Sequence, residues 1–177
     1  MGNSSARKLT IPQIAKELLD ATVRALPQDQ NLMDQCAKSV RGLVPQVYVF
    51  EVLCLKFFVS FAAVRSALPP IFWNSFLDEW DSATRTYSSN SPARIGQFAA
   101  QVGFEDPYAG ILQRTAAYTK ACDEGPKYGE LDITSRTFAR LCCGNQHQKD
   151  LWRVAHFYYN VRRNEILALL KSMVIVP

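Results

Sequence analysis

The longest apolar segment of the sequence runs from Leu43 to Val64, and it constrains the fold more than any other feature. About 22 residues are enough to cross a bilayer as a helix. However, Glu51 and Lys56 lie near its middle, and a charged side chain at that depth is costly in lipid. Residues 46–68 are apolar on nearly every side of a helix, which is typical of a central helix surrounded by others. We therefore expect a buried core helix rather than a membrane span.

Helix start and stop signals divide the rest of the chain into shorter helices. Thr10 and Gln13 form a capping box, and Asp29 is suited to cap a second helix. Ser91-Pro92 and Asp106-Pro107 each place a capping residue before a proline at the first helical position. The 177 residues therefore predict one all-α domain, a bundle of about seven to eight helices around a central apolar helix at 46–68, with no strand pair. The other expected helices cover residues 11–26, 29–41, 70–81, 92–102, 107–122, 134–143 and 150–173.

The ends of the chain and two polar runs are expected to lie outside these helices. The predicted organisation is a flexible polar arm, a helical domain and an apolar C-terminal end, at residues 1–9, 10–173 and 174–177. Residues 82–91 are the most polar stretch of the chain interior, and 123–132 contain two Gly and one Pro, so both are expected to be exposed loops. A free apolar tail is best explained if it docks, either on its own core or on a neighbouring subunit.

The N-terminus and the cysteines bear on where the protein is located. Gly2 is followed by small residues and two bases, which resembles an N-myristoylation signal, although Ala6 stands where the stricter form has Ser or Thr. The alternative is a flexible polar arm with an accidental glycine. Five cysteines, an odd count with no signal peptide, indicate reduced thiols in the cytoplasm. We expect an intracellular protein with peripheral membrane contact only if Gly2 is acylated.

Common catalytic and cofactor-binding motifs do not occur in the sequence. Phosphate-binding loops, dinucleotide fingerprints, zincin and EF-hand motifs and paired CxxC are all missing, and the chain has only two histidines. A zinc site could be imagined from Cys122, Cys142, Cys143 and His147, but Gly144 is expected to break the helix before His147. We favour two ordinary thiols at a helix end. No catalytic residue, cofactor or metal is predicted, and a non-enzymatic function is favoured.

Positive charge is concentrated at the C-terminal end of the chain. The formal net charge is +4, and the last 45 residues hold seven bases and two acids. In the last predicted helix, Arg162 falls on the apolar side, so its long stem would have to carry the charge to the rim. Bases interleaved with aromatics suit phosphate contact and base stacking. The candidate nucleic-acid-binding residues are Arg85, Arg94, Arg153, Tyr159, Arg162 and Arg163. The alternative, which we favour, is an amphipathic core helix with a solvated basic face.

Two further features lie between residues 50 and 81. Aromatic side chains in this region could line a pocket between helices, although such residues are more often simply core. They are Phe50, Phe57, Phe58, Phe61, Phe72, Trp73, Phe76 and Trp80. Asp78, Glu79 and Asp81 lie within one helical turn without a base among them, and they give their helix a local negative face.

Three functions remain open at this point. The favoured one is a non-enzymatic helical interaction or assembly protein, structural and self-associating or bound to a protein partner. The second is a nucleic-acid-packaging protein, such as a coat or nucleocapsid subunit, that uses the basic C-terminal region. The third is a binder of small apolar ligands, or an enzyme acting on one.

Overall fold

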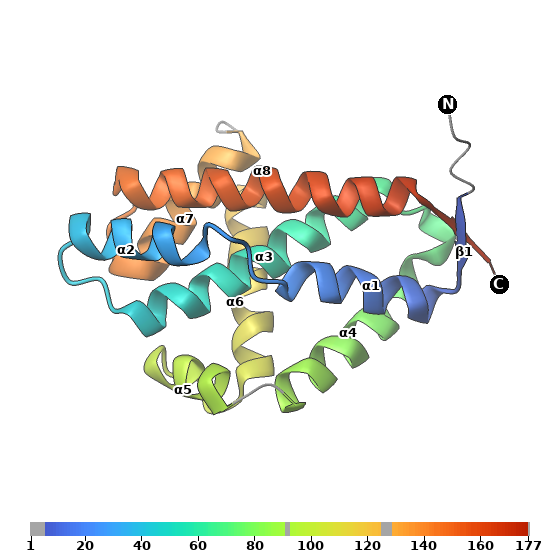
Figure 1. Cartoon of the computed structure of the whole chain (residues 1–177), viewed down its shortest axis with the longest axis horizontal. Helices are drawn as coiled ribbons and strands as arrows, with labels where there is room; N and C mark the ends of the chain where they lie inside the picture. The colour runs from blue at the N-terminus through green and yellow to red at the C-terminus, as the bar shows by residue number, and fades with distance from the viewer. Residues whose placement is uncertain (1–5, 91–92, 125–128, 177) are drawn as a thin grey trace.

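The computed structural model describes residues 6–90, 93–124 and 129–176, and it describes residues 93 and 94 by their backbone alone. These residues form an all-α bundle with one very small sheet (Figure 1). The predicted all-α fold around a central apolar helix is therefore confirmed. The elements are β1 (Arg7–Leu9), α1 (Ile11–Val23), α2 (Asp29–Ser39), α3 (Pro45–Ala67), the 3-10 helix η1 (Pro70–Phe72), α4 (Trp73–Asn90), α5 (Ala93–Gln101), α6 (Pro107–Glu124), α7 (Glu130–Cys143), α8 (Lys149–Lys171) and β2 (Met173–Ile175).

Helix α3 is the centre of the bundle, as its uniform apolarity predicts. By length and composition it is the one helix among the described residues that could cross a membrane. In the structure it packs against all the other α-helices described, most extensively against α8, and it contacts α4 through Phe57 and Trp80. Its two sides belong to two different core clusters. One cluster contains Phe50 and Phe57 together with α1 and α4, and the other contains Leu55 and Phe58 together with α7 and the first half of α8.

The predicted helix boundaries follow local signals in the sequence. The backbone N–H of Thr10 donates to Gln13 Oε1 at 2.9 Å at the start of α1. The backbone N–H of Tyr108 donates to Asp106 Oδ1 at 3.0 Å at the start of α6. Gly144 ends α7 with a φ of 73°, a left-handed conformation that glycine adopts without strain.

The prediction of an exposed loop at 82–91 is wrong, because α4 continues to Asn90. Serine and threonine hydroxyls in this stretch donate back to the carbonyl four residues earlier. Thr84 Oγ1 donates to the Trp80 carbonyl at 2.7 Å, and Ser88 Oγ donates to the Thr84 carbonyl at 2.9 Å. Both side chains are buried, so these two polar residues face inward with their hydrogen bonds already made.

The expectation of no strand pair is also wrong. Residues of the predicted flexible arm form β1, which pairs in parallel with β2 at the C-terminal end, with Lys8 opposite Val174 (Figure 1). Met173 is buried in the core cluster that contains α1, and Ile175 packs against it. The apolar C-terminal end therefore docks on its own chain.

Candidate functional site

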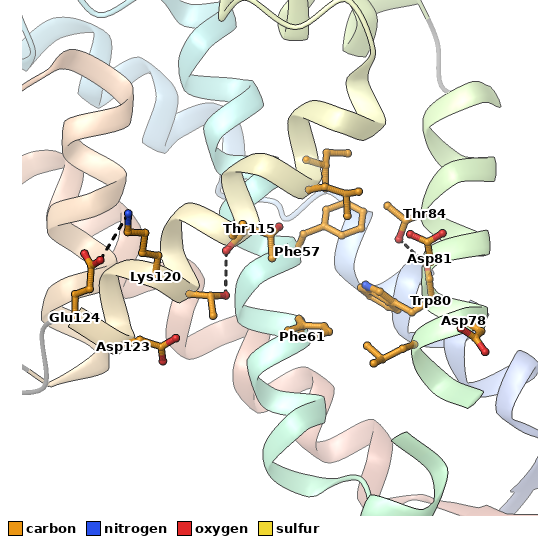
Figure 2. A pocket seen from close by; sticks show the side chains of 15 residues that line it. Phe57, Phe61, Asp78, Trp80, Asp81, Thr84, Thr115, Lys120, Asp123 and Glu124 are labelled. Carbon is orange, nitrogen blue, oxygen red and sulfur yellow. Dashed lines mark hydrogen bonds and ion pairs between the residues drawn. The ribbon is translucent and has the colours of Figure 1, made fainter. Parts of the chain in front are cut away.

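A groove of about 760 Å³ lies between α4 and α6. Phe57 and Phe61 of α3 line it between these two helices (Figure 2). Trp80 of α4 packs edge-on against Phe57, with 5.9 Å between ring centroids. On the α6 side, Ile111 is buried but Leu112 is 46% exposed. The groove thus presents aromatic and aliphatic surface at a place where solvent reaches it.

The sequence of α6 explains why space is left beside α4. Its residues facing the groove recur at helical spacing, and the three that follow Leu112 are small: Thr115, Ala116 and Thr119. Thr119 Oγ1 donates to the Thr115 carbonyl at 3.1 Å, so the hydroxyl is satisfied within its own helix. Short side chains opposite the large Trp80 leave a channel that none of the described residues fills.

Carboxylates line the polar margins of the groove. Asp78 and Asp81 come from α4, whereas Asp123 and Glu124 come from α6 (Figure 2). Among the described residues that line the groove, the one base is Lys120, and its amine lies 3.6 Å from Glu124 Oε1. The groove is therefore acidic in a chain whose net charge is +4.

The four carboxylates differ in how far they are already neutralised. Asp81 accepts a hydrogen bond from the Tyr108 hydroxyl and lies 3.6 Å from Arg85 Nη2. Burial, together with this bond to Asp81, raises the pKa of Tyr108, which therefore stays a neutral donor. Asp78 and Asp123 are exposed, and no ion pair among the described residues involves either of them. These two aspartates are the ones free to attract a cationic partner.

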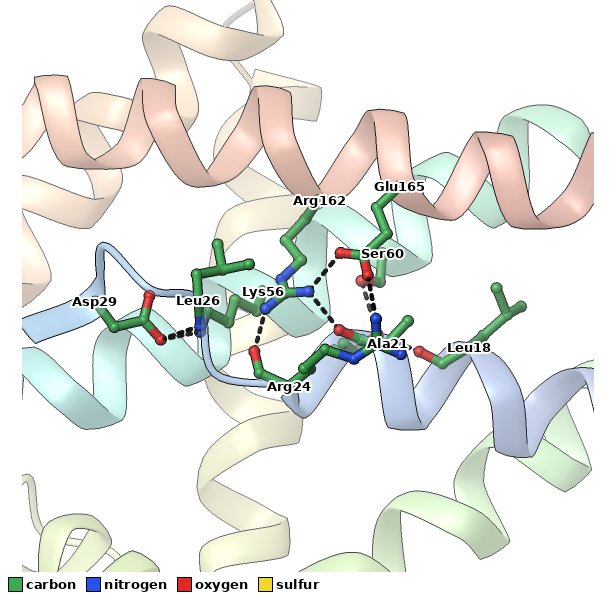
Figure 3. Close-up of polar contacts among 10 residues, drawn as sticks. Leu18, Ala21, Arg24, Leu26, Asp29, Lys56, Ser60, Arg162 and Glu165 are labelled. Carbon is green, nitrogen blue, oxygen red and sulfur yellow. Dashed lines mark hydrogen bonds and ion pairs between the residues drawn. The ribbon is translucent and has the colours of Figure 1, made fainter.

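The predicted nucleic-acid-binding residues do not form one surface. Arg162 is completely buried: Nη1 donates to the Ala21 carbonyl and to Glu165 Oε2, both at 2.5 Å, and Nη2 donates to the Arg24 carbonyl (Figure 3). This corrects the prediction, because the stem of Arg162 runs into the core at the C-terminal end of α1 rather than out to the rim.

Tyr159 and Arg85 are also engaged within the chain. Tyr159 is buried and its hydroxyl donates to Glu130 Oε1 at 3.0 Å, so its ring is not presented for base stacking. Arg85 is exposed but lies over the Tyr108 ring, at 4.3 Å from the centroid. It stands on α4, on the other side of the molecule from α8 (Figure 1). The bases predicted to act together are thus separated.

The remaining candidates are placed as follows. Arg153 is exposed and lies 3.3 Å from Asp150, and Arg163 is half-buried. The side chain of Arg94 and the whole of Gly2 lie outside the described residues. All five cysteines are free thiols. The described residues contain no group of three or more His, Cys, Asp or Glu side chains that could hold a metal ion.

Residues that line the two sides of the groove could be recognised in the sequence, but their proximity in the fold could not. The aromatic residues and the acidic turn at 78–81 were separate features, and the acids at 123 and 124 fell in the predicted loop at 123–132. Only the packing of α6 beside α4 brings Asp123 to the same groove as Asp78. No protein-family model matches the chain, and no curated protein or solved structure is significantly similar to it.

Proposed function

We propose that this chain is a non-enzymatic helical interaction protein whose α4–α6 groove binds an amphipathic, basic helix of a protein partner. The observation that carries the proposal is the pairing of an apolar floor with acidic margins on a chain of opposite net charge. The floor is made by Phe57, Phe61 and Trp80, and the margins by carboxylates on both flanking helices.

The shape of the groove suits a helix. Its lining spans residues 77–84 of α4 and 111–124 of α6, and an α-helix rises about 1.5 Å per residue, so the two walls are about 10 and 20 Å long. An amphipathic helix binds such a groove with apolar anchors at positions i, i+3, i+4 and i+7. The exposed side chain of Leu112 would become buried in that complex.

The charge pattern selects a basic partner. Lys or Arg residues beside the apolar stripe of the partner would lie near Asp78 on one wall and Asp123 on the other. An acidic helix or a nucleic-acid backbone would be repelled by the same carboxylates. Complementary charges of this kind chiefly raise the association rate and determine specificity, and salt screens them.

Isothermal titration calorimetry with a synthetic amphipathic helix tests the proposal. A peptide of Leu and Lys residues should bind, and a Leu and Glu peptide of equal length should not. The Leu112→Asp variant should weaken binding at least about tenfold, because burying a leucine contributes roughly 1.5–3 kcal/mol. Joint Asp78→Lys and Asp123→Lys changes should weaken it about tenfold at low salt.

An acidic residue on a distant helix provides the matched control. Asp34 is exposed on α2, and Asp34→Lys changes the net charge in the same direction without touching the groove. The affinity of the Asp34→Lys variant for the Leu and Lys peptide should stay within about twofold of the affinity of the unmodified protein. The proposal would be contradicted if the Asp34 and groove variants lost affinity for the peptide equally. It would also be contradicted if the protein bound a small cationic amphiphile but no peptide.

A further inference from the structure

A second cavity, of about 260 Å³, lies beside α3 on the side that faces α2 and α5. Most of its lining is apolar, including Met33, Val49, Leu53, Ile95 and Phe98. Its volume is near the lower end of the range for small-molecule sites. It shares no lining residue with the α4–α6 groove, so a role for this cavity does not depend on the proposed function.

The polar side chains that line this cavity include Asp29, Tyr48, Lys56 and Tyr158. Lys56 is 5% exposed, and its amine lies 3.0 Å from Asp29 Oδ2 (Figure 3). The same amine lies 4.9 Å from the centre of the Tyr158 ring. The Tyr158 hydroxyl donates to Asp29 Oδ1 at 2.5 Å. An amine is thus fixed in an otherwise apolar space, with a carboxylate beside it.

The carboxylate does not depend on the amine for its position. Asp29 Oδ2 also accepts the backbone N–H of Leu26 at 3.0 Å, which anchors it at the start of α2. The amine, by contrast, uses one of its three possible donors on a described residue. The buried hydroxyl of Tyr48 lies close to that of Tyr158 but makes no well-formed hydrogen bond within the described chain. Donors facing a small apolar cavity suit a ligand oxygen that accepts hydrogen bonds.

The environment of Lys56 also weakens the hold of its amine on a proton. Burial lowers its pKa, and the opposing influence of Asp29 does not cancel this effect. A desolvated lysine that gives up its proton readily is the usual partner for a carbonyl compound. Because Asp29 and Lys56 already neutralise each other, an anionic ligand would place uncompensated charge beside Asp29.

We propose that this cavity binds a small apolar aldehyde or ketone and that Lys56 forms an imine with it. The amine of Lys56 adds to the carbonyl carbon to form a C–N bond, and two of its three N–H protons leave with the carbonyl oxygen as water when the C=N bond forms. The third proton stays on the nitrogen of the protonated imine, which pairs with the Asp29 carboxylate; although burial opposes the shift, the hydrogen bond from Tyr158 helps to keep the pKa of Asp29 low. The step is a condensation, so it needs no oxidant or reductant.

Reductive trapping with benzaldehyde and cyanoborohydride at neutral pH tests this inference. At limiting aldehyde, peptide mapping by mass spectrometry should find the benzyl adduct mainly on Lys56, although several of the other lysines, such as Lys16, are far more exposed. Glyoxylate, a charged aldehyde, should label Lys56 several-fold less. Adducts spread over exposed lysines with Lys56 unmodified would overturn the proposal, and so would equal labelling by both aldehydes.

Three variants separate the cavity from general reactivity. Lys56→Arg keeps the charge beside Asp29 and should abolish the adduct while the protein stays folded. Ile95→Trp fills the cavity without touching the amine and should reduce labelling of Lys56 several-fold. Lys16→Arg is the surface control and should leave labelling of Lys56 unchanged. Undiminished labelling in the Ile95 variant would show that the cavity does not bind the aldehyde.

Discussion

Three charged side chains are buried in the described part of the chain, and each is accommodated differently. Arg162 donates to two backbone carbonyls and to Glu165. Lys56 has one carboxylate partner beside a cavity. Glu51 accepts from Arg114 Nε at 2.7 Å through one oxygen, and its other oxygen has no hydrogen-bond partner among the described residues. Since a buried charge is costly unless it is paired, these residues differ in what their replacement would do.

Glu51 should make stability fall as the pH rises. Burial raises its pKa to about 7, although Arg114 opposes the shift. A raised pKa in the folded state means that the stabilising contribution is complete below the unfolded pKa and is lost as the pH rises through about 7. The free energy of unfolding can be measured by urea denaturation at pH 5 and at pH 8. Its decrease between these two pH values should be up to about 3 kcal/mol larger in the unmodified protein than in Glu51→Gln. Parallel pH profiles for the two proteins would refute this assignment.

Arg162 should matter for stability rather than for ligand binding. Replacement by Met removes this donor from two carbonyls at the end of α1 and leaves the carboxylate of Glu165 with Arg24 as its remaining partner among the described residues. Breaking a buried pair on one side costs about 3–5 kcal/mol. Arg153→Met is the control: its side chain is 81% exposed, and its loss should cost less than about 0.5 kcal/mol. Similar denaturation midpoints for both variants would show that the buried contacts of Arg162 contribute nothing.

Two helical glycines provide a matched pair at the scale of single elements. A Cβ at Gly110 of α6 would lie 2.9 Å from ring carbons of Phe50 and Phe104, whereas a Cβ at Gly96 of α5 would meet no described atom within 4 Å. Alanine favours a helix by about 1 kcal/mol over glycine, but overpacking costs about 1–3 kcal/mol.

Thermal denaturation should therefore move in opposite directions for the two alanine variants. Gly96→Ala should raise Tm by about 2–4 °C, the shift expected from a gain of roughly 1 kcal/mol in a chain of this size. Gly110→Ala should lower Tm, because the aromatic rings of Phe50 and Phe104 must move. An increase in both variants would mean that α6 can withdraw from α3 at no cost.

The sequence allowed helix boundaries to be predicted where the determinants are local. The capping residues Thr10 and Asp106 and the glycine at 144 act within a few residues, so α1, α6 and α7 begin or end close to the predicted positions. The extent of α4 was missed because Thr84 and Ser88 satisfy their hydroxyls inside the helix, although their polarity is typical of a loop.

Features that join distant parts of the chain could not be predicted. The β1–β2 pair joins the two ends of the described chain, and each strand has only three residues. The position of Arg162 on the apolar side of α8 was visible in the sequence, but its partners at the end of α1 were not. The groove was hidden for the same reason, since its two walls are separate helices.

At the scale of the whole molecule, α3 organises two cores, and the α4–α6 groove and the cavity beside Lys56 lie on different sides of it. The α4–α6 groove combines exposed apolar surface with acidic margins, and the smaller cavity surrounds Lys56. The basic α8 lies on the far side from α4 (Figure 1). This separation of charge leaves the acidic groove accessible to a basic partner without competition from residues of α8.

Hydrogen–deuterium exchange with and without the Leu and Lys peptide is the most direct test of the groove as the binding surface. We predict slower exchange confined to α4 and α6, residues 73–90 and 107–124, and the same pattern in the Asp34→Lys protein. The protection should disappear in Leu112→Asp at the same peptide concentration. Protection that falls instead on α8, or no protection in α4 and α6 at saturating peptide, would contradict the assignment of the groove as the binding surface.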